Sequence, residues 1–167
     1  TKVLKEMNRK YTKEQYLNLV EKMKAKIPNL TLSTDIIVGF PGETDDDFQD
    51  TLDVVNEVGF ENAFMFMYSV RSGTPAATMD EQVSEQVKSE RLQQLMRLQN
   101  MKAKEETKKY LDQTIKVLVE GPSKKNPEML TGRTSTHKIA LFKSDRTDLK
   151  GKFVNIRVYD TKTWTLY

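Results

Sequence analysis

The feature that most restricts the fold is the alternation of helical and strand patterns over the first two thirds of the chain. Apolar residues recur at helical spacing through residues 12–27, 44–58 and 84–111, and two apolar segments, residues 31–38 and 63–69, separate them. This alternation is typical of βα units on a parallel sheet. We expect the first strand to be buried and the second to be buried on both faces, because residues 63–69 are apolar nearly throughout.

Local signals mark the ends of the predicted helices. Thr12 followed by Gln15 predicts a capping box, Thr44 is placed to begin the second helix, and Gly59 is placed to end it. In the second helix we expect the buried side to carry Phe48, Thr51, Leu52 and Val55. In the third we expect it to carry Val87, Leu92, Leu95, Met96 and Leu98.

After Leu111 the pattern changes to short segments rich in Val, Ile, Thr and aromatic residues, separated by Gly, Pro, Asn and Asp. These segments are 114–121, 128–134, 137–142, 151–160 and 163–167. Five short strands at this spacing predict a small, partly open β-barrel of the oligonucleotide-binding (OB) kind. We therefore expect an α/β domain over residues 1–111 and an all-β domain over residues 112–167.

Charge is distributed unevenly between these two predicted domains. Residues 1–111 carry a net charge of −2 and residues 112–167 a net charge of +5, although the whole chain carries only +3. A compact basic module is typical of a domain that binds a polyanion, and a plain solvated surface is the alternative.

Composition excludes several kinds of site. The chain contains no cysteine and a single histidine, which excludes disulfides and every thiolate metal or cluster site. No apolar run approaches the roughly 20 residues of a membrane span, so we expect a cytoplasmic protein without a membrane partner. The first residues resemble neither a signal peptide nor an initiation site, and we interpret them as an internal start within a longer chain.

The segment "GFPGE", residues 39–43, turns the chain from the first strand toward the second helix. Gly39 and Gly42 remove side chains where the backbone leaves the carboxyl edge of the sheet, where α/β folds bind ligands. We expect free backbone groups there to meet a flat polar molecule. Asp45, Asp46 and Asp47 disfavour a phosphate, so an adenine edge or a sulfonium group fits better, and an ordinary well-capped βα turn remains the alternative.

Four segments resemble the radical S-adenosylmethionine (radical SAM) methylthiotransferases. They are "MNRKYT" (7–12), "DIIVGFPGET" (35–44), "YSVRSGTPAA" (68–77) and "LVEGPSKKNPEMLTGRTSTHK" (118–138), and the last is similar to the family's C-terminal TRAM domain. The resemblance implies the C-terminal βα units of a partial TIM-like radical SAM barrel, followed by an OB-like TRAM barrel. Its Gly-Pro-Ser-Lys-Lys segment favours the bacterial tRNA branch, which methylthiolates an isopentenylated adenosine beside the anticodon.

The resemblance also implies cofactors and site residues. S-adenosylmethionine would be bound by Arg9, Gly39, Phe40, Pro41, Gly42 and Glu43, with Tyr11 beside Arg9. Two 4Fe–4S clusters would be ligated outside this chain, which has no cluster cysteines, no metal ligands and no catalytic residue of its own. The chain alone is therefore expected to be inactive.

For tRNA we expect contacts from both predicted domains. The resemblance implies contacts from Arg71, Thr74 and His137, and the basic residues gathered in the small second domain predict contacts from Lys124, Lys125, Arg133 and Lys138. His137 stands where the family usually has Asn, and Val70 and Ser72 stand where relatives frequently have proline, so we expect a less rigid loop. An exposed basic surface without RNA is the alternative for the lysines.

Two functional interpretations stay open. The first is part of a tRNA methylthiotransferase, whose partners are tRNA and the missing N-terminal part of the same enzyme; sister branches act on another tRNA adenosine or a ribosomal protein. The second is a stand-alone RNA-binding adaptor with a degenerate barrel. In either case the first strand is expected to lack its preceding parallel neighbour, which predicts self-association.

Overall fold

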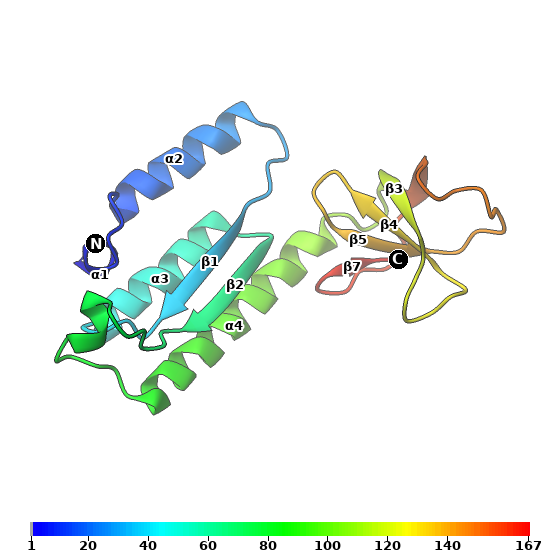
Figure 1. Cartoon of the computed structure of the whole chain (residues 1–167). Coiled ribbons are helices and arrows are strands. Elements are labelled where there is room, and N and C mark those ends of the chain that lie inside the picture. The colour runs from blue at the N-terminus through cyan, green and yellow to red at the C-terminus, as the bar shows by residue number, and fades with distance from the viewer. Residues whose placement is uncertain (1) are drawn as a thin grey trace. The chain divides into compact units, whose positions relative to one another are not determined.

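The computed structural model describes residues 2–167 and divides into two compact units (Figure 1). One unit ends at Lys102 and the other begins at Ala103, so the division falls inside helix α4, Glu85–Lys108. Within the described residues no helix has the length and apolar character needed to cross a membrane.

The first unit alternates helices and strands, as the sequence predicts. Its elements are α1 (Lys2–Glu6), α2 (Lys13–Lys26), β1 (Ser33–Val38), α3 (Asp45–Val58), β2 (Asn62–Met67), the 3₁₀ helix η1 (Pro75–Thr78) and the first part of α4. All three predicted helix ends are confirmed: Thr12 and Gln15 form a capping box, Thr44 caps the start of α3, and Gly59 ends α3 in the left-handed conformation at φ 62°.

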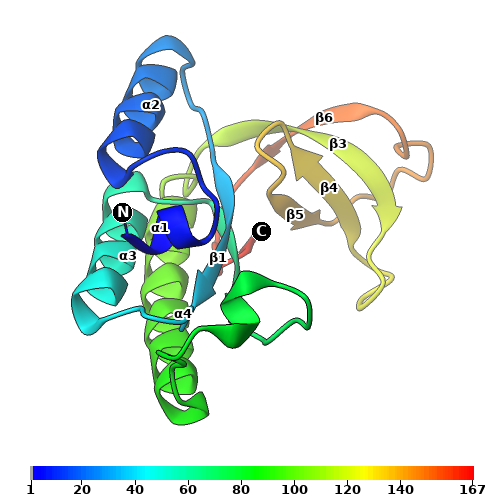
Figure 2. The same ribbon diagram turned by 60° about the vertical axis from the view of Figure 1, so that its left-hand side comes forward.

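β1 and β2 form a two-stranded parallel sheet, with Ile36 opposite Met65. One face of this sheet packs against α3 and α4, which lie on the same side of β1 in Figure 2. The core there contains Val38 of β1, Val55 of α3, Leu95 of α4, and Phe60 between α3 and β2, none more than 1% exposed. Burial of these apolar side chains holds the sheet and the two helices together.

The prediction that β2 is buried on both faces is wrong. Phe64 is 56% exposed and Phe66 is 52% exposed, and Ile37 of β1, opposite Phe66, is 41% exposed. Side chains alternate between the faces of a strand, so these three share the face opposite the α3–α4 core. The helices of this unit that share its core, α2, α3 and α4, pack on the other face.

The expected buried side of α4 also needs correction. Leu95 is fully buried, but Met96 is 43% exposed, and the inward positions include Lys88, Arg91 and Gln99. Gln99 donates from Nε2 to the backbone oxygen of Phe60 at 2.9 Å. The spacing of apolar residues does not reveal this face, because polar residues occupy much of it. Each of these polar residues is buried with a hydrogen-bonding or ionic partner.

The second unit contains five strands in the order β6-β3-β4-β5-β7. They are β3 (Thr114–Pro122), β4 (Leu130–Thr134), β5 (Ile139–Phe142), β6 (Phe153–Arg157) and β7 (Thr165–Leu166). Neighbours pair antiparallel, except that β5 and β7 are parallel. Val117, Ala140, Val158 and Leu166 form its core, all 0% exposed.

This sheet is open rather than closed into a barrel. β6 and β7 lie at its two edges, and no ladder joins them within residues 2–167. The chain beyond β6 nevertheless approaches the C-terminus, because the Tyr159 N–H donates to the Tyr167 oxygen at 2.7 Å and the Tyr167 N–H donates to Asp160 at 2.9 Å. A few backbone hydrogen bonds therefore connect the chain after β6 to the chain after β7. The sequence predicts a partly open barrel, and the sheet itself is open.

Candidate functional site

The turn between β1 and α3 requires glycine at two positions. Gly39 and Gly42 have φ values of 73° and 77°, which lie in the left-handed region that side chains disfavour. A Cβ atom at Gly39 would also collide with Cγ of Lys88, and one at Gly42 would lie 2.9 Å from Oε2 of Glu81. The left-handed backbone together with packing against Lys88 accounts for Gly39, and the left-handed backbone accounts for Gly42, without a ligand.

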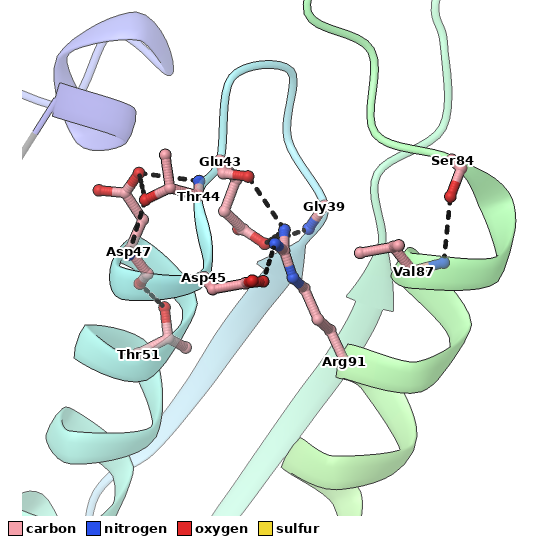
Figure 3. Close-up of polar contacts among 9 residues, drawn as sticks. All are labelled: Gly39, Glu43, Thr44, Asp45, Asp47, Thr51, Ser84, Val87 and Arg91. Carbon is pink, nitrogen blue, oxygen red and sulfur yellow. Dashed lines mark hydrogen bonds and ion pairs between the residues drawn. The ribbon is translucent and has the colours of Figure 1, made fainter.

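Glu43 fixes the shape of this turn (Figure 3). Its Oε1 accepts hydrogen bonds from the Gly39 N–H and from Nη1 of Arg91, both at 2.8 Å. Arg91 also donates to the Glu43 carbonyl at 3.1 Å and to Oδ1 of Asp45 at 2.7 Å. The side chains of Arg91 and Glu43 are only 8% and 3% exposed, so the ion pair lies inside the protein.

The expectation of free N–H groups in this turn is wrong for three of its four donors. Gly39 donates to Glu43, Gly42 donates to the Glu81 carbonyl at 2.8 Å, and Glu43 donates to the Phe40 carbonyl at 2.9 Å. Buried backbone donors rarely go without partners, and here the protein itself supplies them. A ligand at this edge would have to meet other groups than these N–H donors.

In the turn, the effect of burial on the carboxyl groups is opposed by hydrogen bonds and by the Arg91 guanidinium. Burial raises the pKa of Glu43, and the Gly39 N–H and the Arg91 guanidinium act in the opposite direction. At the start of α3, burial would raise the pKa of Asp47, but hydrogen bonds from the Thr44 backbone and hydroxyl hold it below its usual range. Since Arg91 is engaged by two carboxylates, the turn offers no free cation to a phosphate.

Phe40 and Pro41 belong to the packed interior rather than to an open ligand surface. Phe40 is 5% exposed and meets the Tyr68 ring edge to face, with 5.2 Å between the ring centroids. The Lys88 ammonium lies 5.5 Å from the Tyr68 ring centroid and pairs with Glu85 at 2.7 Å. Of the predicted cofactor residues, these two contribute mainly by fixing the turn.

Arg9 and Tyr11 lie at a separate cavity of about 250 Å³ among α1, α2, β1 and α3. Its lining includes Glu43 and combines apolar residues with Asp35, Asp47 and Asp50. The structure therefore brings Arg9 and Glu43 to one cavity, whereas Gly39, Phe40, Pro41 and Gly42 do not line it. The predicted cofactor-binding residues therefore fall into two groups, those that line the cavity and those that form the turn after β1.

The loop after β2 carries the predicted substrate residues Arg71 and Thr74, both exposed. The Thr74 hydroxyl donates to the Arg71 carbonyl at 2.8 Å just before η1 begins. This hydrogen bond orders the backbone, while the Arg71 side chain lies at the surface.

The predicted RNA residues of the second unit differ in exposure. Lys124, Lys125 and His137 are exposed, and Arg133 is held by Glu120, with Nε 2.8 Å from Oε1. Lys138 is 4% exposed and donates to Oγ1 of Thr107 at 2.8 Å. Lys138 therefore has a structural position, and we leave it out of the proposed RNA surface.

Sequence reasoning missed two groups of residues. Arg91 and Lys88 hold the turn from α4, and their charge hid their inward position. Phe153 is 64% exposed on β6, although the alternation in "FVNIR" could have placed it opposite the core residues Val154 and Ile156.

Comparison with known proteins matches both units. Residues 1–55 match the Radical SAM superfamily, and residues 108–167 match the TRAM domain. Over all 167 residues the chain is 59% identical to the tRNA-2-methylthio-N(6)-dimethylallyladenosine synthase of Fusobacterium nucleatum and covers 38% of that protein. Proteins of the same name from Acetivibrio thermocellus and Alkaliphilus oremlandii are 54% and 51% identical over 99% and 98% of this chain, which covers 34% and 35% of them.

The chain spans between 34% and 38% of the length of these relatives. The resemblance to methylthiotransferases that the sequence motifs carry is thereby confirmed along the whole chain. By these matches the chain corresponds to the C-terminal part of the radical SAM segment of such methylthiotransferases, followed by their TRAM domain.

Proposed function

We propose that this chain acts as the C-terminal part of a tRNA methylthiotransferase that modifies an isopentenylated adenosine beside the anticodon. The observation that supports this most is the 59% identity, over every residue of the chain, to a protein named for that activity. A tRNA substrate would place the reaction in the cytoplasm. We also propose that β1 and β2 belong to a TIM-like barrel, and that residues 112–167 form an OB-like module.

The chain's residues do not fit an iron–sulfur cluster. The sequence has no cysteine, and within residues 2–167 no group of three or more His, Cys, Asp or Glu could hold a metal ion. We therefore propose that the two 4Fe–4S clusters of the family's chemistry are ligated by residues outside this chain.

S-adenosylmethionine fits the first unit better than a cluster does. When bound, it supplies the methyl group and the means to activate the substrate carbon. We propose that Arg9 and the cavity beside it contact the cofactor, and that Gly39, Phe40, Pro41, Gly42 and Glu43 hold the strand end in shape. Arg91 positions Glu43 and, through it, this turn.

The second unit would bind the tRNA backbone through Lys124, Lys125 and Arg133, with His137 beside them. The first two lie in the loop after β3 and are exposed. Phosphate contacts release counterions, so the affinity should fall as salt rises, and each lost contact should lower the log–log slope by about 0.7 to 0.9. A salt titration of tRNA binding by the parent chain and by Lys124→Ala/Lys125→Ala measures this; equal slopes would remove the two lysines from the interface.

The activity is tested by analysing tRNA nucleosides from cells with and without the gene that encodes this chain. We expect the methylthio group to disappear from the isopentenylated adenosine while the isopentenyl group remains. Loss of methylthio from a different nucleoside, or from a ribosomal protein, would assign the sequence to a sister branch. No change in any methylthiolated product would contradict the enzymatic proposal and favour an RNA-binding adaptor.

A further inference from the structure

The outer face of β3 and β6 presents an aromatic ring among basic and polar side chains. Phe153 of β6 lies opposite Leu118 of β3, and Asn155 lies opposite Lys116. Phe153 is 64% exposed and Leu118 is 38% exposed. We propose that Phe153, Leu118 and Lys116, named here the β3–β6 platform, stack an unpaired nucleobase of the bound RNA; this rests on the proposed tRNA binding.

The strand register explains why this platform faces outward. Val117 and Val119 of β3 are at most 1% exposed, and Val154 and Ile156 of β6 pack against the same core. Their odd–even alternation with Lys116, Leu118 and Phe153 places the latter on the opposite face of the sheet. The core is therefore complete without Phe153, and the ring adds nothing to its packing.

The surroundings of the ring match a nucleotide in charge and shape. The Lys116 ammonium lies over the Phe153 ring, 4.9 Å from its centroid, so a base that stacks on that face displaces the ammonium toward its own phosphate. Every base has a flat π face, so an exposed aromatic ring on a sheet binds single-stranded nucleic acid without demanding a sequence. Asn155 adds an amide that can bond a base edge.

Other charges on this face leave the platform basic. Arg157 lies opposite Thr114 and pairs with Asp112 at 3.5 Å, but both side chains are more than 70% exposed. Such a solvated pair is weak, so Arg157 is free to turn toward a phosphate. Glu120, the acidic residue of β3 on this face, is already bound to Arg133. A negatively charged RNA segment is thus favoured over a cationic partner.

The test measures binding of the whole chain to a tRNA anticodon stem–loop and to a blunt duplex made from its stem. We expect Phe153→Ala to weaken stem–loop binding about five- to hundred-fold and to leave duplex binding unchanged, because stacking requires an unpaired base. Phe153→Trp should restore the affinity. Tyr159→Ala, which removes another exposed aromatic outside the strands, should retain the parent's affinity for both RNAs.

The position of the stacked base follows from the same assay with single abasic sites in the loop. One abasic site should weaken binding by the parent and have no further effect on Phe153→Ala, as expected for two groups that contact each other. If Phe153→Ala binds the stem–loop as tightly as the parent, the platform is overturned, although salt-dependent binding would still support the tRNA proposal. If the parent binds neither RNA, the tRNA proposal itself fails.

Circular dichroism and thermal unfolding separate stacking from misfolding. Because Phe153 contributes an exposed ring, Phe153→Ala should unfold at nearly the parent's temperature. A loss of affinity accompanied by a comparable loss of β structure would contradict a direct role of the ring.

Discussion

The two units of this chain complete their cores to different degrees. In the second unit the inward side chains of five strands form a core whose central members, such as Val117 and Leu166, are fully buried. In the first unit one face of the β1–β2 sheet is packed by helices, while Phe64 and Phe66 on the other face are half exposed. Parallel sheets are normally covered on both faces, so the first unit is organised for a further covering layer and the second is not.

The sharpest way to break this comparison is to truncate one phenylalanine on each face of the first unit. Phe60 is 1% exposed, and Phe60→Ala should lower the free energy of unfolding by about 3–5 kcal/mol, because it leaves a cavity. Phe64 is 56% exposed, and Phe64→Ala should change it by less than about 1 kcal/mol. Urea denaturation of both variants measures the difference; similar losses would mean that the second face is covered.

A second comparison uses two glycines that both have positive φ angles but different surroundings. Gly39→Ala should cost about 2–4 kcal/mol, since it combines a left-handed alanine with a collision against Lys88. Gly73 has φ 81°, and a Cβ atom added there would have no heavy atom within 4 Å, so Gly73→Ala should cost only the backbone strain of about 1–2 kcal/mol. The difference between the losses of stability of Gly39→Ala and Gly73→Ala, measured by thermal unfolding, gives the contribution of the Lys88 contact. Equal losses would show that the Lys88 side chain moves aside at no cost.

The uncovered face should also make the chain self-associate. We expect the parent to sediment as more than a monomer at high concentration, and Phe64→Ser/Phe66→Ser to weaken the association by at least about tenfold, because burial of a phenylalanine stabilises by about 1.5–3 kcal/mol. Phe153→Ser is the matched control, since it removes a similarly exposed ring from the unit whose core is complete. A strictly monomeric parent would contradict the prediction.

The smallest expected effect concerns the cap of α3 and depends on pH. The pKa of Asp47 is lowered in the folded state, so its contribution to stability is present above the unfolded pKa of about 3.9 and is lost as pH falls through the folded pKa. Asp47→Asn should lower stability by about 0.5–1 kcal/mol at neutral pH. Asp46→Asn alters the same turn without touching the Thr44–Asp47 box and should cost less stability at neutral pH. Urea titrations of Asp47→Asn and the parent at several pH values should show their difference shrink as the pH falls.

Much of the fold follows from signals that lie close together in the sequence. The Thr12–Gln15 and Thr44–Asp47 caps bridge three residues, and the predicted helices and strands all form near their expected positions. Such signals are readable because caps and periodic patterns act within a few residues along the chain. The motifs were equally informative about family, as the comparisons confirm for both units.

The candidate site depended more on distant contacts. Glu43 and Arg91 are separated by 48 residues, and nothing in the local pattern of α4 marks Arg91 as buried. Lys138 is likewise a surface residue by composition, yet it is buried against Thr107, which lies 31 residues earlier. A charged side chain is buried where another element supplies a hydrogen-bonding or ionic partner. Contacts between elements far apart in the sequence cannot be predicted from the local pattern.

The sequence by itself determined the order of helices and strands, their caps, the two-part organisation and the family, because each depends on local propensity or on ordered motifs. The tertiary structure decided which faces are covered, why Gly39 and Gly42 must be glycines, and which basic and aromatic side chains reach the surface. Those properties depend on which distant segments pack together. The same residue type is buried or exposed according to its neighbours: Phe60 is buried, whereas Phe64 and Phe153 are exposed.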